Sequence, residues 1–298
     1  MFSRRHPFLF FILFFSVIVA VTVVLTSLMS LVREKQAAAS FGEKVGVIEI
    51  GGVITDARPV LEQLKRFREQ EGIKAIVLRI NSPGGAVGPS QEIYREVRKT
   101  AAVKKVVASL GSVAASGGYY VAAAADRIMA NPGTITGSIG VIMAYTNFEE
   151  LFDKIGLRPI VIKSGKYKDL ASPVREMSDT ERALLQEFTD NVHMQFITDV
   201  AEGRGQSPAA IRKIADGRIF SGEIAQGHGL VDRMGNLADA IEWAGKLGGI
   251  KGEARPVYPP EKKPRILRYL MEMAVAEMRS LMAESSVPPA SYMYMPGK

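Results

Sequence analysis

Short apolar runs alternate with helical patterns along most of this chain, and that alternation restricts the fold more than any other feature. Five runs indicate buried strands, at residues 45–50, 75–80, 105–110, 127–130 and 159–162. Apolar residues at helical spacing predict helices at residues 59–68, 92–103, 179–201, 208–214, 222–226 and 238–245. Such alternation is typical of an α/β domain with a largely parallel sheet.

Two connections and one helix start are also predicted. Residues 111–125 should begin as a tight turn and continue as an Ala-rich helix, and residues 131–140 form a Gly/Thr/Ser loop. Ser178, with Glu181 three residues later, is typical of a capping box at the start of the long helix.

The segment Phe8–Val32 is almost wholly apolar and carries no charge. At about 1.5 Å per residue a helix of this length would reach about 37 Å, enough to cross a bilayer core of about 30 Å. A cleaved signal peptide is the alternative, but its apolar region normally runs about 7–15 residues. Because Arg4 and Arg5 precede the run, we expect a cytoplasmic N-terminus and a translocated domain.

We therefore expect five regions. These are a cytoplasmic N-terminus (1–7), a transmembrane anchor (8–32), a linker (33–44), a catalytic domain (45–250), and a C-terminal region (251–298) with a linker, an amphipathic helix and a mobile tail. The amphipathic helix, residues 265–282, would lie on a membrane, pack on a partner subunit, or dock on its own domain.

Composition excludes several classes of function. The chain has no cysteine, so it has no disulfide framework, thiolate metal site or cysteine nucleophile. The net charge is +7, but the basic residues are not gathered into one patch. Basic residues beside apolar segments fit an anionic membrane surface, and we expect no nucleic-acid partner.

Two glycine-containing turns indicate where chemistry could occur. The turn 81–85 carries Gly84 and Gly85, whose N–H groups could form an oxyanion hole, although a plain strand-to-helix turn would look the same. Ser116 lies at the predicted start of a helix among small residues, followed by Gly117. It is either an accessible nucleophile with Gly117 as an oxyanion donor, or an ordinary helix N-cap.

A serine nucleophile needs a base, and the candidates are few. Of three histidines, His6 precedes the apolar run, His193 lies within the long helix, and His228 lies in a turn where a Ser–His–Asp triad is conceivable. A lysine is the alternative base if burial lowers its pKa from about 10.4. The segment 163–169 offers three lysines, and composition does not choose among them.

Three sequence blocks closely resemble the bacterial signal peptide peptidase A family in its short, single-domain form. They are residues 114–120 (AASGGYY), 131–141 (NPGTITGSIGV) and 163–169 (KSGKYKD). The resemblance implies the ClpP/crotonase fold of stacked ββα units. It places the nucleophile on Ser116, the general base on Lys168, and the serine that holds the lysine amine on Ser138.

The resemblance also implies oxyanion donors at Gly84, Gly85 and Gly117, with no metal or cofactor. It implies a homo-oligomer in which neighbouring subunits share each site. The expected substrates are cleaved signal peptides, cut by a single-pass protein of the bacterial inner membrane with its catalytic domain outside the cytoplasm. The alternatives are a crotonase-type acyl-CoA enzyme on the same fold and a catalytically inactive membrane scaffold.

Overall fold

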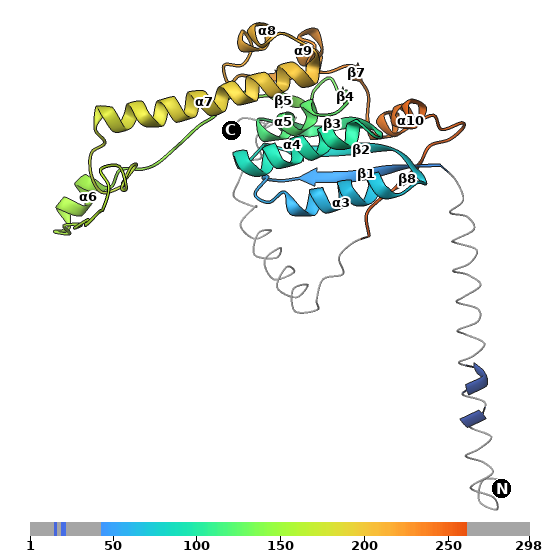
Figure 1. Ribbon diagram of the computed structural model, residues 1–298, viewed down its shortest axis with the longest axis horizontal. Coiled ribbons are helices and arrows are strands. Elements are labelled where there is room, and N and C mark those ends of the chain that lie inside the picture. Colours follow the sequence, from blue (N-terminus) through green and yellow to red (C-terminus); the bar gives the residue numbers. More distant parts are fainter. Residues whose placement is uncertain (1–14, 17–18, 22–42, 261–298) are drawn as a thin grey trace, which may run out of the picture. The chain divides into compact units, whose positions relative to one another are not determined.

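The computed structural model describes residues 15–16, 19–21 and 43–260 (Figure 1). Among these residues no helix is both long enough and apolar enough to cross a bilayer. Most of the predicted anchor (8–32), most of the linker after it (33–44) and the predicted C-terminal helix (265–282) lie outside the described residues. A second compact unit, residues 259–298, also lies almost entirely outside them.

A parallel sheet forms the centre of the domain. Its strands run in the order β6 (Ile219–Ser221), β5 (Ile135–Gly137), β3 (Lys105–Ala115), β2 (Ile73–Ser82), β1 (Lys44–Gly51) and β8 (Arg255–Val257). A side branch pairs β4 (Arg127–Ala130) with β3 and with β7 (Arg233–Met234). The pairing is parallel except between β5 and β6.

Helices cover both faces of the sheet, which explains why its central strands are apolar throughout. On β1, Val45 and Val47 pack toward α10 (Leu237–Leu247), whereas Ile48 and Ile50 belong to the larger core on the opposite face. That core includes α3 (Arg58–Glu69), α4 (Val87–Ala101), α5 (Gly117–Ala123) and part of α7 (Asp179–Arg204). The chain also has the shorter helices α6 (Glu149–Lys154), α8 (Pro208–Arg212) and α9 (Gly222–Gly227).

The predicted elements are mostly confirmed, and the capping box of Ser178 and Glu181 is present at the start of α7. One connection differs from the prediction. Residues 111–115 continue β3 instead of forming a turn, because Val113–Ala115 pair with β5 within the loop 131–140. Strand β3 thus divides its pairing, with β4 along residues 107–109 and with β5 along 113–115. This divided pairing places Ser116, the residue after β3, at the end of the sheet.

The strand predicted at residues 159–162 is wrong. These residues have no regular secondary structure, and Ile160 and Ile162 are 87% and 97% exposed. No strand of the described chain lies beside them to pair with. They belong to a segment, residues 141–178, that we call the arm. Figure 1 shows α6 and the N-terminal part of α7 lying beyond the edge of the sheet.

Candidate active site

Ser116 joins the end of β3 to the start of α5 through a strained backbone. Its φ and ψ are 52° and −122°, values that favour glycine. The strain is held by hydrogen bonds on both sides, since Ser116 N donates to the Gly137 carbonyl (2.9 Å) and Tyr120 N to the Ser116 carbonyl (2.8 Å). The Ser116 side chain makes no capping hydrogen bond. Ser116 thus occupies the N-cap position of α5 without capping it, and its hydroxyl has no hydrogen-bond partner among the described residues.

The turn 81–85 packs directly against Ser116. A Cβ atom added to Gly84 would lie 2.7 Å from Gly117 N and 2.9 Å from the Ser116 Cβ, and Gly84 has φ of +102°. A Cβ added to Gly117 would lie 3.2 Å from Gly85 N. Only glycine at these positions lets the two backbone segments approach so closely.

Two backbone N–H groups remain available beside the serine. Neither Gly85 N nor Gly117 N has an acceptor among the described residues, whereas Gly84 N donates to Ser82 Oγ (3.1 Å). The turn that carries Gly85 is held by hydrogen bonds to Ile54. Ile54 N donates to the Gly84 carbonyl (2.9 Å), and Ala86 N donates to the Ile54 carbonyl (2.8 Å). Free donors fixed in this way are what a developing oxyanion requires.

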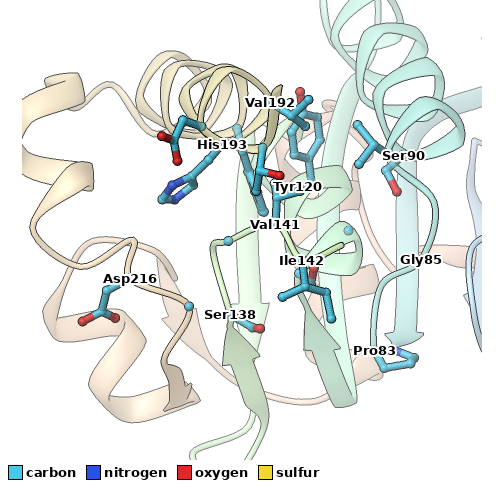
Figure 2. Close-up of a pocket in the computed structure, with 18 of the residues that line it drawn as sticks. Pro83, Gly85, Ser90, Tyr120, Ser138, Val141, Ile142, Val192, His193 and Asp216 are labelled. Carbon is cyan, nitrogen blue, oxygen red and sulfur yellow. The ribbon is translucent and has the colours of Figure 1, made fainter. Parts of the chain in front are cut away.

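A cavity of about 540 Å³ opens in front of these groups (Figure 2). Ser116, Gly85, Gly117 and Ser138 all line it. One part of its wall is apolar, formed by Pro83, Val87, Tyr120, Val141, Ile142 and Phe196. Tyr120 is held in place by its hydrogen bond to Asp199, and its ring packs on Phe196 at 4.6 Å between centroids. The wall suits a small or apolar group of a ligand.

Ser138 faces the same cavity from the loop after β5. Its φ is 50°, and its N–H donates to the Arg218 carbonyl (2.8 Å). Arg218 pairs with Asp216, which also lines the cavity, and this pairing lowers the pKa of Asp216 to about 2. Asp216 is therefore an anion at neutral pH.

His228, the histidine for which a triad was conceivable, does not lie at the cavity of Ser116. His228 is exposed, packs its ring on Phe220 (5.1 Å between centroids) and does not line the cavity. His193 does line it, which the sequence analysis missed. The signal was present in the spacing of Gln186, Thr189, Asp190 and His193, which places them on one face of α7. The Nε2 atom of His193 is buried without a hydrogen-bond partner among the described residues.

Lys168 does not line this cavity. It lies on the arm, its side chain is exposed, and it has no ion pair among the described residues. The single chain thus brings together Ser116, Ser138, Gly85 and Gly117, and leaves Lys168 apart from them. No cluster of possible metal ligands occurs in the described part of the chain.

A serine with a free hydroxyl beside two free backbone donors defines, on this α/β scaffold, an acyl-transfer enzyme that uses a serine nucleophile. Residues 98–251 match Peptidase family S49, and residues 41–135 match Clp protease. The chain belongs to Peptidase family S49 and is a serine endopeptidase of the signal peptide peptidase A type, which confirms the resemblance seen in the sequence.

Several relatives support this assignment. A protein from Synechocystis sp. described as a protease is 45% identical over 210 residues, which are 70% of this chain and 76% of the relative. A protein from Enterococcus faecium described as signal peptide peptidase SppA is 36% identical over 67% of this chain and 62% of its own length. Protease 4 of Salmonella typhi is 34% identical over 83% of this chain and 41% of its own length. The match thus spans less than two thirds of the last two proteins.

Proposed function

We propose that this chain is a membrane-anchored endopeptidase whose active sites combine Ser116 of one subunit with Lys168 of a neighbouring subunit. The observation that carries the proposal is the composition of the cavity. Within the described part of the chain its serine hydroxyl and two N–H donors have no partners, and no lysine lines it. Lys168 is exposed on the arm of the same chain, where a second copy could receive it.

The exposed apolar residues of the arm favour such an assembly. Ile142, Ile160 and Ile162 are each at least 87% exposed, and Phe148, Leu151 and Leu157 are exposed as well. Large apolar side chains exposed in such number on one segment favour an interaction site. A second copy seated there would bury these side chains and would also exclude water from Lys168, as a neutral amine requires.

The proposed reaction has two steps. Neutral Lys168 accepts the proton of the Ser116 hydroxyl as the oxygen attacks the peptide carbonyl, and the N–H groups of Gly85 and Gly117 stabilise the oxyanion. Lys168 then gives that proton to the departing amine as the C–N bond breaks, leaving an ester on Ser116. In the second step a water molecule loses a proton to Lys168 and attacks the ester carbonyl. The C–O bond to Ser116 then breaks, Lys168 returns that proton to the Ser116 oxygen, and the acid is released.

The structure also suggests roles for Gly84 and Ser138. Because the Gly84 N–H is already bonded to Ser82, its part is to allow the close approach of the turn, and Gly85 and Gly117 act as the donors. Ser138, on the cavity wall, would donate a hydrogen bond to the neutral lysine amine, or accept one from it, and so hold the amine toward Ser116.

The cellular setting rests on the apolar run 8–32, which would anchor the chain as a single pass in the bacterial inner membrane with the catalytic domain outside the cytoplasm. Cleaved signal peptides are apolar remnants in that membrane, and the apolar wall of the cavity suits their side chains. A peptidase is favoured over an acyl-CoA enzyme or an inactive scaffold because the chain belongs to a peptidase family.

Mixing two inactive variants tests the shared site. Ser116→Ala and Lys168→Ala proteins should each be inactive toward a fluorogenic signal-peptide fragment. When they are unfolded and refolded together in equal amounts, about a quarter of the wild-type activity should return, because a site needs an intact residue from each of two neighbours. Lys166→Ala, which alters a neighbouring lysine, is the matched control and should remain active.

The outcomes separate the alternatives. Mixtures without any activity contradict a site shared between subunits. A Lys168→Ala protein that still reacts with a serine-directed acylating probe at the normal rate contradicts the base assignment. A wild-type protein that turns over CoA thioesters and no peptides would favour the acyl-CoA enzyme, and one that turns over neither would favour the scaffold.

A further inference from the structure

An ion-pair cluster lies directly beside Lys168 on the arm. Asp169, the next residue, accepts hydrogen bonds from Lys163 on one carboxylate oxygen and from Arg175 Nε on the other (2.9 Å). Arg175 also binds Glu181, with 2.9 Å between Nη1 and Oε2 and a second contact from Nη2. Arg175 therefore connects the residue after Lys168 to the first turn of α7.

Glu181, at the α7 end of this connection, is firmly held. Glu181 is only 4% exposed, and its carboxylate also accepts hydrogen bonds from the N–H and hydroxyl of Ser178, both at 3.0 Å. These contacts, with Arg175 the largest and Ser178 next, lower the pKa of Glu181 to about 2. Glu181 is thus a permanent anion at neutral pH, attached to a helix that runs back to the core.

The contacts of Arg175 with Asp169 fix the backbone of the loop that carries Lys168. Arg175 Nη2 donates to the Asp169 carbonyl (3.2 Å). Together with the bonds to the two carboxylates, the guanidinium makes four hydrogen bonds to Asp169 and Glu181. The loop adds its own turns, since Lys168 N donates to the Gly165 carbonyl (3.1 Å) and Ser172 N to the Asp169 carbonyl (3.0 Å). A planar guanidinium that binds in this bidentate way also sets direction, which a lysine does not.

The cluster has an electrostatic consequence as well. Both carboxylate oxygens of Asp169 are occupied by Lys163 and Arg175, so Asp169 is not free to pair with Lys168. Their contacts, led by Arg175, hold the pKa of Asp169 well below its usual range. An adjacent free carboxylate would favour the charged form of a lysine, and the cluster removes that influence.

We infer that Arg175 is a positioning residue for Lys168, because it fixes the loop that carries the lysine and keeps Asp169 engaged elsewhere. This inference rests on the proposed function, in which Lys168 is the general base. Arg175 does not line the cavity and touches no reacting atom; it acts only through the placement and surroundings of Lys168.

The arm carries other charged groups. Lys166 is close in sequence, and its amine lies over the Tyr167 ring at 5.1 Å. On α6, Glu150 pairs with Lys154 at 3.9 Å, and Glu149 and Asp153 complete the charges of that helix. These groups are present equally in every variant compared below, so differences between variants report on Arg175 and Asp169.

The test measures acylation of Ser116 by an active-site probe as a function of pH, in the full-length protein. Arg175→Ala should lower the maximal acylation rate about 10- to 100-fold, since small displacements of a catalytic group have effects of this size, with little change in the apparent KM. The acidic limb of its pH–rate profile should also move to higher pH, by about half a pH unit, because Asp169 is no longer paired with Arg175. Arg175→Lys should restore part of the rate, because one cation can still bind Asp169.

A double variant and a matched control separate positioning from folding. Asp169→Asn added to Arg175→Ala should return the acidic limb to its original pH without restoring the rate. Arg182→Ala removes an exposed guanidinium from the same turn of α7 and should behave like the wild type. Thermal melting of each variant shows whether a lost rate follows lost folding.

The inference is overturned if Arg175→Ala acylates at the normal rate with an unchanged pH profile while Lys168→Ala is inactive. It is also overturned if Arg175→Ala loses rate only in proportion to unfolded protein. A Lys168→Ala protein that acylates normally would overturn the proposed function, and the inference with it.

Discussion

The two parts of the proposed site are stabilised by different interactions. The half that carries Ser116 lies where buried strands and turns meet, and its shape comes from backbone packing so close that side chains are excluded at Gly84 and Gly117. The half that carries Lys168 lies on the exposed arm, and its shape comes from ion pairs among Lys163, Asp169 and Arg175, and between Arg175 and Glu181.

This difference teaches how a site can be divided between subunits. The oxyanion donors must be fixed before substrate arrives, so they belong to the rigid centre of the fold. In the proposed assembly the base would have to meet a cavity in another copy, which a segment that reaches outward would allow. Charge pairs can define such a segment locally without a hydrophobic core of its own.

The largest effect expected from either half is the loss of the nucleophile. Ser116→Ala should reduce peptide hydrolysis by at least about 10³-fold, because removal of a nucleophilic serine leaves only binding and oxyanion stabilisation. The fold should persist, since the hydroxyl makes no hydrogen bond in the described chain. Hydrolysis of a fluorogenic peptide checks this, and activity retained by the variant would place the nucleophile elsewhere.

The next effect tests whether close packing shapes the oxyanion donors. Gly84→Ala puts a methyl group 2.7 Å from Gly117 N at a residue with positive φ, and should slow acylation by about 10²-fold. Gly88→Ala is the matched control, because its Cβ would meet nothing within 4 Å and its φ is not positive. Rates of probe labelling decide the comparison. Equal rates for both variants would mean that the turn does not shape the donors.

Acid should loosen the arm and leave the centre intact. The folded-state pKa of Glu181, about 2, is lower than its ordinary value, so the stability it confers is complete at neutral pH and is lost as pH falls toward 2. Hydrogen exchange, corrected for intrinsic rates, should therefore rise about tenfold in residues 163–181 between pH 7 and pH 2. Strands β1 to β3 should change far less.

Glu181→Gln provides the control for that experiment. The variant lacks the titrating carboxylate, so its arm should exchange faster already at pH 7 and respond less to acid. An arm that stays equally protected at both pH values in the original protein would show that ion pairs do not hold it.

The sequence predicted the centre of the fold better than its connections. Strands β1 and β2 and the capped start of α7 follow from apolar runs and from Ser178 with Glu181, which are local signals. The extension of β3 and the short β5 were not predicted, because their small residues become strand only by pairing with each other. The apolar run 159–162 has the composition of a strand, but no strand in the described part of the chain pairs with it.

The candidate site shows the same limit. Four residues that the motifs singled out, Ser116, Ser138, Gly85 and Gly117, line one cavity, while their catalytic roles stay predictions. His193 was missed because the folding of α7 over the cavity is a long-range contact that local sequence does not report. The strained φ of Ser116 could not be predicted either, since it is imposed by the Gly137 carbonyl and the Gly84 turn, both distant in sequence.

The smallest expected effect measures that strain. Ser116→Gly and Ser116→Ala both remove the nucleophile, but glycine tolerates φ of 52° and ψ of −122°, whereas alanine does not. The glycine variant should be more stable than the alanine variant by about 1 kcal/mol in chemical denaturation. At Ser112, an exposed strand residue without positive φ, the order should reverse, because glycine weakens a strand. If alanine is the more stable replacement at both positions, the turn at Ser116 stores no strain, and the rigid half of the comparison loses its physical basis.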